Sequence, residues 1–404
     1  MMRLRVNASA LGVWVFGLVI LYMAGIALAG ALFFAFLFYL FVPLLSFIVL
    51  CHTFITFHYH ESFSTEHPVK NQPVTYTLLL ANDTVLAPAA VVITFRSPGA
   101  AARMDLPPLD MVLKRRQSVK KTFTLTFPFR GIYEVGMERI VLSDHLRWLS
   151  YSPPVWWRTF YVYPRVIELS TVFAGLRNMI ESSGAGRGII QDYALFRELS
   201  EYREARAVKH VAWKKYAATG NLYVREYETS SWPGIEIYLD LRREGEPDHA
   251  VLEREDCSVE ILTALVNYFL KRSVRVNVHA ATGRDRYEFT AREPDEFDRF
   301  FRSTITLTFA PAPSPAALFR ADMEERGLAS GTVVFITHTA DPEVLELSSG
   351  RRARDVTFFT VLNRVNVPPR ETAAERDRLG REARDQGSII FVESSDAVRE
   401  SLEQ

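Results

Sequence analysis

Side chains that could carry chemistry follow two apolar runs in the C-terminal half of the chain. Asp240 ends one run, and His338 follows Thr337, the last residue of another; Asp341 lies shortly beyond. Carboxylates and imidazoles are the usual general acids and bases of enzymes. One hypothesis is therefore a hydrolase that uses His338 or Asp240, with Asp341 as the only nearby second group.

Other common catalytic and metal-binding patterns are missing from the sequence. It contains no Gly-x-Ser-x-Gly, His-Glu-x-x-His or Cys-His arrangement. Its two cysteines, Cys51 and Cys257, are too few for a disulfide framework or a four-thiolate zinc site. Four histidines cluster without acids or thiols at ligand spacing, which favours an interfacial region over a Zn²⁺ site; they are His52, His58, His60 and His67. We therefore expect no enzymatic activity and no cofactor.

The composition narrows the class of protein. The chain has 404 residues, with 47 Lys and Arg against 47 Asp and Glu. This balance argues against nucleic acid as a partner, because a phosphate backbone is bound through excess positive charge. Apolar residues make up 48% of the chain and are concentrated at its start. That concentration argues against a freely soluble protein.

The apolar start, residues 1–55, predicts a transmembrane helical hairpin. Residues 8–48 contain no Asp, Glu, Lys, Arg or His. One transmembrane helix needs about 20 apolar residues, and this stretch is about twice that length. We predict helices near residues 8–27 and 31–50, with a bend between Gly25 and Gly30. The alternatives are one long tilted helix or a hairpin that enters the bilayer without crossing it.

The charges beside this stretch predict its orientation. Arg3 and Arg5 precede it without an acidic residue, so the positive-inside rule keeps the N-terminus in the cytoplasm. Two crossings return the chain to the same side. We expect a multi-pass protein of the cytoplasmic (inner) membrane, with the lipid bilayer as one partner and residues after about 55 in the cytoplasm.

Residues 56–165 show short runs with two-residue alternation, separated by turn residues such as Arg130-Gly131. This pattern predicts an antiparallel β-sandwich. Three tryptophans of this region fit core and strand-face packing better than the alternative, contact with lipid headgroups; they are Trp148, Trp156 and Trp157. The expected strands are residues 74–80, 91–95, 119–127, 133–142 and 159–163.

Apolar strands alternate with helical patterns in residues 231–404. This alternation predicts an α/β domain with a mainly parallel sheet covered on both faces. Ligands of such folds lie outside the carboxyl ends of the strands, so Asp240 and the residues after Thr337 are the positions of interest. Strands are expected at residues 235–240, 274–278, 332–337, 356–362 and 388–392, and helices at 253–271, 293–301, 315–326 and 372–385.

A linker, residues 166–230, carries the most distinctive pattern. It contains Gly184-Ala-Gly-Arg-Gly188 and later a Leu-x-Val-Arg-Glu strand. It resembles the signature of the bacterial and archaeal family called domain of unknown function 58. That family's architecture is similar to the whole chain: two membrane helices, a β-rich region, the signature, and a von Willebrand factor A-like (Rossmann-like) domain. The matching positions are Tyr202, Trp213, Ala217, Gly220, Leu222, Val224, Arg225 and Glu226.

The acidic half of that signature is missing here. Ala205 stands where the family has the Gly of a Gly-Asp pair, and Arg206 and Ala207 occupy its acidic positions. Ala212 replaces the Asp before Trp213. The aromatic and strand half remains and supplies the candidates for partner binding, which are Tyr202, Arg203, Trp213, Arg225 and Glu226.

The resemblance also implies a cation site. Von Willebrand A-like domains commonly hold a Mg²⁺-like ion through Asp-x-Ser-x-Ser after the first strand and an Asp after the fourth. Asp240 matches the first Asp, but Arg242 and Glu244 stand at the two Ser positions and His338 at the second Asp. Arg242 would bring positive charge against the ion. We therefore expect a degenerate site without a metal.

These features predict a membrane-anchored, non-enzymatic scaffold or adaptor that binds other proteins. The resemblance implies a MoxR-type AAA+ ATPase as partner, in assembly or remodelling of envelope proteins. Two alternatives stay open. One is an outward-facing, metal-dependent adhesion protein, which needs an intact cation site and the opposite topology. The other is the hydrolase introduced above, tethered to the membrane.

Overall fold

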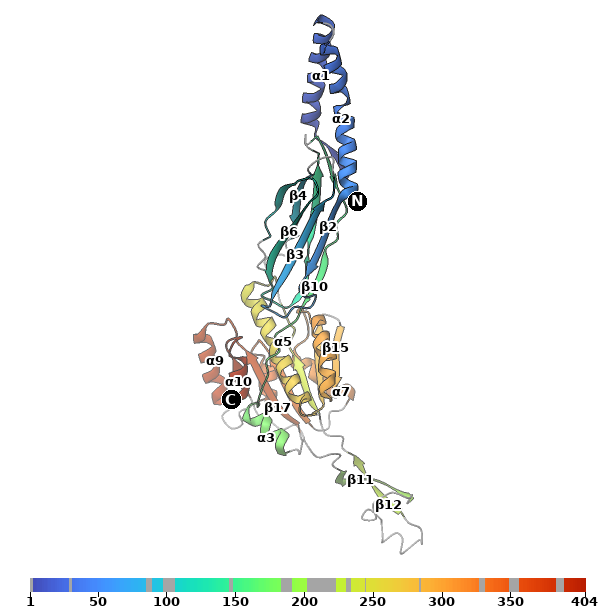
Figure 1. Cartoon of the computed structure of the whole chain (residues 1–404). Helices are drawn as coiled ribbons and strands as arrows, with labels where there is room; N and C mark the ends of the chain where they lie inside the picture. Colours follow the sequence, from blue (N-terminus) through green and yellow to red (C-terminus); the bar gives the residue numbers. More distant parts are fainter. Residues whose placement is uncertain are drawn as a thin grey trace. The chain divides into compact units, whose positions relative to one another are not determined.

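The computed structural model forms two compact units, Met1–Tyr163 and Pro164–Gln404, each described here by itself (Figure 1). The residues described are 3–28, 31–84, 89–96, 106–144, 148–182, 191–201, 223–229, 234–243, 245–282, 285–326, 331–348, 356–382 and 389–404.

The first unit begins with two apolar helices, α1 (Ala8–Leu28) and α2 (Ala31–Thr56). Both are long and apolar enough to cross a membrane. They pack antiparallel, because Trp14 lies against Tyr39 and Tyr22 against Phe36. The two predicted helices are confirmed, and α2 extends one and a half turns beyond its predicted end at residue 50.

Both ends of this helical pair are joined to the β-strands that follow. The N-terminal strand β1 (Arg3–Val6) pairs antiparallel with β9 (Leu149–Ser152), an element that the sequence analysis did not predict. The last turns of α2 contact β8 (Met137–Ser143) and β9. There Leu50 and Thr53 are each only 3% exposed. The helices and strands therefore share one packed structure.

The strands of residues 57–163, which we call the β-region, form three antiparallel groups, one of which β1 joins at its edge. One buried cluster takes side chains from all three groups, including Tyr76, Ile93 and Phe160. The groups are β1-β9-β8-β4-β5, β2-β3-β6 and β10-β7. The remaining bounds are β2 (Phe57–Phe63), β3 (Pro73–Asn82), β4 (Ala89–Phe95), β5 (Leu109–Leu113), β6 (Gln117–Thr126), β7 (Gly131–Val135) and β10 (Arg158–Val162).

A glycine divides the predicted run 133–142 into two strands of different groups. Gly136 lies between β7 and β8 and has a φ of +140°, a conformation that residues with a Cβ rarely adopt. A Cβ added there would lie 3.3 Å from the Trp157 Cα. Glycine therefore fits both the backbone conformation and the close approach of the chain.

Gly136→Ala is expected to lower the free energy of unfolding by about 1–3 kcal/mol, because alanine is strained at this φ and its methyl group meets the Trp157 backbone. Gly131→Ala is the matched control. Gly131 has a φ of +142°, but its added Cβ would meet only the Tyr133 ring at 3.9 Å. Thermal unfolding of both variants measures the difference, and equal losses would assign the whole effect to backbone strain.

The second unit contains a six-stranded sheet in the order β15-β14-β13-β16-β17-β18. Every neighbouring pair is parallel except β14 and the edge strand β15. Counted from β13, this is the order 3-2-1-4-5-6 of a doubly wound fold. The strands are β13 (Ile235–Leu239), β14 (Val276–Thr282), β15 (Asp285–Ala291), β16 (Gly331–Thr337), β17 (Val356–Asn363) and β18 (Ile389–Val392).

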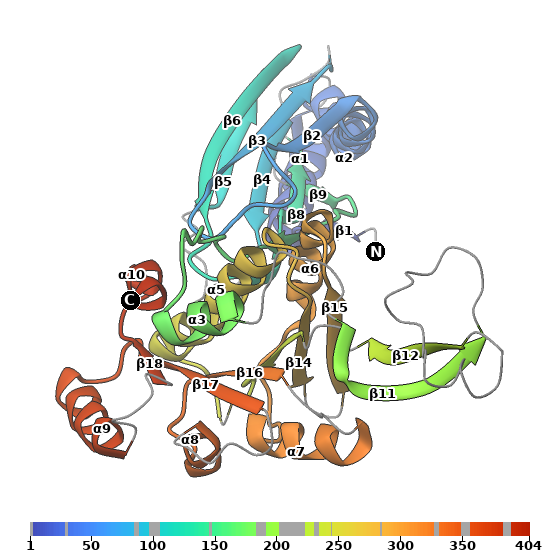
Figure 2. The ribbon, with the colours of Figure 1, turned by 90° about the horizontal axis from the view of Figure 1, so that it is seen from below.

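Helices cover both faces of this sheet (Figure 2). Side chains of β13 alternate between the faces: Ile237 joins the buried cluster under α5 (His249–Leu270), and Tyr238 joins the one under α7 (Pro315–Arg326). The predicted mainly parallel sheet is therefore confirmed. The other helices are α3 (Ala174–Ser182), α6 (Phe297–Ser303), α8 (Pro342–Ser348), α9 (Pro369–Glu382) and α10 (Val398–Glu403), with 3-10 turns η2 (Pro294–Glu296) and η3 (Thr304–Thr306).

The unit begins well before the predicted domain start at residue 231. Val172 and Leu176 are fully buried in the cluster under α5. Arg165 donates two hydrogen bonds, of 3.1 and 3.0 Å, to the buried carboxylate of Glu260 on α5. The first part of the predicted linker thus belongs to the α/β core. Two further strands of this unit, β11 (Gln191–Glu201) and β12 (Tyr223–Thr229), pair antiparallel.

Candidate functional site

The candidate site lies where the strand order of the α/β sheet reverses. β13 and β16 are parallel neighbours, and β14 lies on the other side of β13. Asp240 directly follows β13, and Thr337 is the last residue of β16. Crossover connections leave such a point in opposite directions, which opens a crevice at the carboxyl ends of the strands. In many α/β proteins this crevice holds the ligand.

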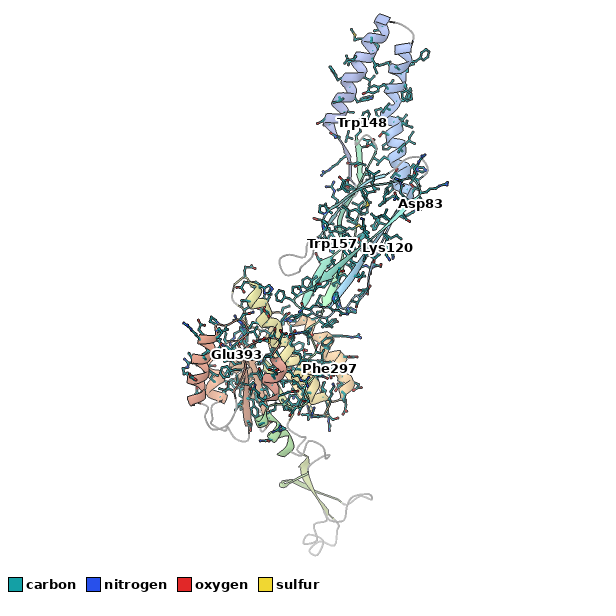
Figure 3. All side chains as sticks on the ribbon, turned by 60° about the vertical axis from the view of Figure 1, so that its left-hand side comes forward. Asp83, Lys120, Trp148, Trp157, Phe297 and Glu393 are labelled. Carbon is teal, nitrogen blue, oxygen red and sulfur yellow. The ribbon has the colours of Figure 1, made fainter. Side chains whose placement is uncertain are left out.

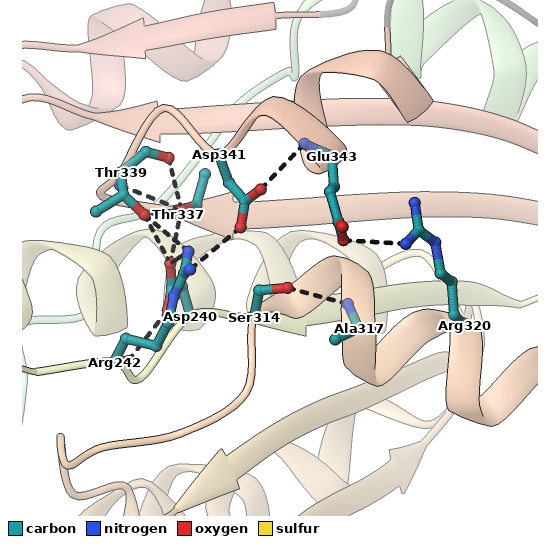
Figure 4. Close-up of polar contacts among 9 residues, drawn as sticks. All are labelled: Asp240, Arg242, Ser314, Ala317, Arg320, Thr337, Thr339, Asp341 and Glu343. Carbon is teal, nitrogen blue, oxygen red and sulfur yellow. Dashed lines mark hydrogen bonds and ion pairs between the residues drawn. The ribbon is translucent and has the colours of Figure 1, made fainter.

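The guanidinium of Arg242 lies against Asp240 at this point (Figure 4). Its Nε donates to Asp240 Oδ1 at 2.9 Å and one terminal nitrogen to Oδ2 at 2.7 Å. The backbone N–H of Arg242 also donates to Oδ1, at 3.1 Å. The chain therefore turns directly after β13, and the turn brings the two side chains into a bidentate ion pair.

Residues that follow β16 complete the cluster. Thr337 donates from Oγ1 to Asp240 Oδ2 at 2.7 Å. Arg242 donates to Thr339 Oγ1 at 2.8 Å, and its other terminal nitrogen lies 3.1 Å from Asp341 Oδ2. We call these five residues, Asp240, Arg242, Thr337, Thr339 and Asp341, the switch-point cluster. It joins the ends of two strands that are far apart in the sequence.

The charges of the switch-point cluster are strongly coupled. Burial raises the pKa of Asp240, but the hydrogen bonds from Arg242 and its positive charge outweigh burial, so the pKa lies below the ordinary value of 3.8. The same hydrogen bonds raise the pKa of Arg242. One guanidinium therefore lies between the side chains of Asp240 and Asp341.

His338 lies beside this cluster in a different environment. Burial lowers the pKa of its imidazole, and the nearby charge of Asp240 only partly opposes that effect. Its ring packs edge-on against Phe309, with centroids 6.1 Å apart. The imidazole is therefore neutral at pH 7 and is held in an apolar contact.

The stability that Asp240 contributes should depend on pH. Because its folded pKa lies below the unfolded value of 3.8, its contribution is complete above about pH 5 and is lost as the pH falls through 3.8 toward the folded pKa. We expect the difference in unfolding free energy between the wild type and Asp240→Asn to shrink between pH 5 and pH 3. Denaturation curves at successive pH values measure it. A difference that stays constant over this range would contradict the assigned coupling.

The switch-point cluster does not fit the divalent cation that the resemblance implies. A hard cation needs several oxygen ligands turned toward it. Both carboxylate oxygens of Asp240 instead accept hydrogen bonds from Arg242, so an entering ion would meet the guanidinium charge. Within the described ranges, no group of three or more His, Cys, Asp and Glu side chains could hold a metal ion.

The contacts of the switch-point cluster also determine whether its two carboxylates could act in catalysis. Asp240 is fully buried at its side chain and saturated by Arg242 and Thr337, so it is not free to take a proton from a substrate. The carboxylate of Asp341 is 11% exposed and paired with Arg242. These contacts give both carboxylates a structural role in the part of the chain described.

The other predicted site residues are not members of the switch-point cluster. Glu244, Tyr202, Arg203 and Trp213 lie outside the described residues. Arg225 and Glu226 lie on β12, where they pair with Leu199 and Glu198. Of the four histidines, His58 and His60 share the exposed face of β2. His52 Nδ1 lies 2.8 Å from Thr84 Oγ1, and His67 lies near Tyr161.

A second polar cluster, which the sequence analysis missed, lies on the α7 face of the sheet. His279 Nε2 is 2.7 Å from Glu236, and its Nδ1 is 3.6 Å from Asp322 on α7. The ring stacks on Tyr238, whose hydroxyl donates to Asp322 at 3.1 Å. Asp322 is only 2% exposed. The cluster is enclosed and links α7 to β13 and β14, so its geometry fits a structural role.

No family model and no curated protein matches the chain. Among solved structures, a β-glucosidase from Erythrobacter marinus is 14% identical, over 26% of this chain and 15% of that chain, with a TM-score of 0.17. A cycloisomaltooligosaccharide glucanotransferase from Paenibacillus sp. is 12% identical, over 82% and 52%, with a TM-score of 0.16. A Bacteroides uniformis β-glucuronidase is 12% identical, over 82% and 39%, with a TM-score of 0.16.

The chain spans between 15% and 52% of the length of these three structures. At TM-scores this low, the similarity defines neither the fold nor the activity of the chain.

Proposed function

We propose that the protein is a membrane-anchored, non-enzymatic scaffold or adaptor that binds other proteins. Its partner is a MoxR-type AAA+ ATPase, and its work is assembly or remodelling of envelope proteins. In this proposal the β-region is an antiparallel sandwich, and the second unit is a von Willebrand factor A-like domain of the family called domain of unknown function 58. The observation that carries the proposal is the switch-point cluster, in which the Arg242 guanidinium pairs with both Asp240 and Asp341.

The structure of the first unit supports the anchoring. α1 and α2 are two helices of membrane-spanning length, packed against each other. β1 precedes α1 and pairs with β9, which follows α2. Strand pairing requires both segments to be on one side of the bilayer, so the helices enter and return. This pairing favours a returning hairpin over one long tilted helix.

The arginines of β1 support a cytoplasmic location for the rest of the chain. Arg3 and Arg5 are the only charged residues before α1, and basic residues beside a transmembrane helix stay in the cytoplasm. A fluorescent-protein fusion at the C-terminus is expected to fluoresce, and an alkaline phosphatase fusion there to be inactive. An active phosphatase fusion would contradict this orientation and support the outward-facing alternative.

The switch-point cluster supports protein binding without metal or catalysis. An A-like domain with an intact cation site binds an acidic partner group through the ion. Here the cation is the protein's own guanidinium, and its donors are taken by Asp240, Thr339 and Asp341. The remaining means of action are surfaces, including the signature half that carries Trp213 and Arg225.

The proposed partner can be tested by photo-cross-linking in intact membranes. A benzophenone amino acid at Trp213 or Arg225 is expected to capture an AAA+ ATPase. The same group at Arg378, an exposed position on α9, serves as the control and is not expected to do so. Failure of both signature positions to capture an ATPase in cells that express one would contradict the proposed partner.

A further inference from the structure

A cluster of aromatic and polar side chains joins α1 and α2 to the end of the β-region. Trp14 donates from its indole Nε1 to the Tyr39 carbonyl at 3.0 Å, and its ring lies 6.4 Å from that of Trp148. Ser46 on α2 donates a short hydrogen bond to Asp144, which follows β8. We call Trp14, Tyr39, Ser46, Asp144 and Trp148 the junction cluster. It ties the middle of the apolar helices to the β8–β9 end of the β-region.

The C-terminal half of α2 has one buried face and one exposed face. Ser46, Leu50 and Thr53 lie on one face at helical spacing and are at most 8% exposed, because β8 and β9 cover them. On the rest of the helix, Ile48 is 51% and Ile55 is 71% exposed. The apolar surface that needs a non-aqueous environment therefore continues alongside the β-region.

The lengths of both helices place the junction cluster within the bilayer. A hydrocarbon core of about 30 Å takes about 20 helical residues. About 20 residues counted back from Leu28 end at about Ser9 on α1, and about 20 counted forward from Ala31 end at about Leu50 on α2. These two positions mark the boundary of the hydrocarbon core on each helix. Trp14 and Ser46 lie about 6–8 Å on the hydrocarbon side of it, and a tilted helix would move the boundary further toward the β-region.

We infer that the β8–β9 end of the β-region enters the lipid bilayer beside α2, with Trp148 in the interfacial layer. This inference rests on the proposed membrane anchoring. The partner is lipid, because the apolar surface of the membrane-spanning part of α2 continues, without interruption, along the exposed face of its C-terminal half. Indole rings favour this layer, where an apolar ring and a polar N–H are both accommodated.

The polar groups of Trp14, Ser46 and Asp144 make hydrogen bonds within the protein, as hydrocarbon surroundings require. Asp144 accepts from Ser46 and, at 2.9 Å, from the Leu149 backbone N–H. Asp144 is only 3% exposed. The indole N–H of Trp14 is bonded to the Tyr39 carbonyl. A carboxylate at this depth is therefore shielded from lipid.

The tryptophans separate into two groups by position. Figure 3 shows Trp148 at the helix end of the β-region and Trp157 away from it. Trp157 packs under the Arg96 guanidinium at 4.5 Å, and Trp156 is 81% exposed. Among the three tryptophans of the β-region, only Trp148 is expected to reach lipid, so Trp156 is a control within the same unit.

Fluorescence quenching in vesicles tests this inference with the full-length chain. The chain has six tryptophans, and single-tryptophan variants retain Trp148, retain Trp156, or carry Phe38→Trp as the only one. Phe38 lies on α2 and is 72% exposed. Vesicles of phosphatidylethanolamine and phosphatidylglycerol contain acyl chains brominated at defined depths. Quenching of Trp148 is expected within about twofold of that of Phe38→Trp and strongest for bromines near the headgroups, as for an interfacial ring. Trp156 is expected to be unquenched.

The outcomes distinguish the inference from the anchoring on which it rests. Quenching of Phe38→Trp with an unquenched Trp148 would overturn the insertion of the β8–β9 end and leave the anchoring intact. No quenching of Phe38→Trp would overturn both. A spin label at Leu149→Cys, with Cys51 and Cys257 replaced by serine, gives a second measurement. It is expected to collide with oxygen more often than with a nickel chelate, and the reverse order would overturn the inference.

Discussion

Replacing Arg242 by serine is expected to lower the free energy of unfolding of the second unit by about 3 kcal/mol, or about 6–12 °C in melting temperature for a unit of this size. The reason is the carboxylate of Asp240, which is fully buried and would lose both hydrogen bonds from the guanidinium. Thermal unfolding of the purified full-length protein measures the loss. Arg320→Ser is the matched control, because Arg320 and Glu343 form an exposed pair at 3.1 Å close to the same site. Such a pair contributes about 1 kcal/mol or less.

The same variant tests what Arg242 replaces. Arg242→Ser leaves carboxylate and hydroxyl oxygens at Asp240, Asp341, Thr337 and Thr339 without the guanidinium, a donor set that suits a hard cation. Added Mn²⁺ is therefore expected to raise the melting temperature of Arg242→Ser and to leave the wild type unchanged. Mn²⁺ stabilisation of the wild type, lost in Asp240→Ala, would contradict the assigned role of Arg242.

Arg165→Ala is expected to destabilise the second unit by about 3–5 kcal/mol, because it removes the bidentate partner of a buried carboxylate. Glu260 is 0% exposed at its side chain, and Arg165 is 31% exposed. The hydrogen bonds to Glu260 hold the pKa of Arg165 above its ordinary value. Arg165 also donates to the Ser395 carbonyl at 3.1 Å. The side chain thus joins the start of the unit to α5 and to the segment before α10. Chemical denaturation measures the loss.

The matched control is Lys271→Ala. Lys271 pairs with Glu168 at 2.8 Å, but the two side chains are 50% and 76% exposed, so water and salt screen the pair. Its removal is expected to cost less than about 1 kcal/mol. Arg165→Lys should lie between the two, since an ammonium cannot make both hydrogen bonds of the guanidinium. Equal losses for Arg165→Ala and Lys271→Ala would contradict the structural role of Arg165.

The regular elements were predicted where one local pattern dominates. The uncharged stretch predicted α1 and most of α2, and apolar runs predicted five of the six strands of the α/β sheet. The antiparallel edge strand β15 was missed. β1 was missed because Arg3–Val6 is short and its partner β9 lies far along the chain. The end of α2 was placed too early because its last turns are stabilised by contacts with β8 and β9, which hydropathy does not record. The division of the predicted run 133–142 at Gly136 depends on the φ of this glycine, which the alternation of apolar and polar residues does not indicate.

The candidate site was located from the sequence, but its chemistry was not. Sheet topology made the residues after β13 and β16 positions of interest, and both Asp240 and Thr337 are there. From the sequence, Arg242 was predicted only to oppose a cation through its charge. Its bidentate contact with Asp240 depends on the turn after β13. Its contacts with Thr339 and Asp341 depend on β13 and β16 being neighbours, which sequence order does not state.

The pairing of β1 with β9 has a consequence for how the protein is made. β1 leaves the ribosome before both apolar helices, and β9 is synthesised only after these helices and most of the β-region. Until then β1 has no partner in its sheet. In the proposed membrane-anchored protein, helices that failed to turn back would leave β1 on the opposite side of the bilayer from β9. β9 would then have an unpaired edge, which promotes aggregation or proteolysis. Under this proposal the β1–β9 pairing can form only after both helices have inserted and returned.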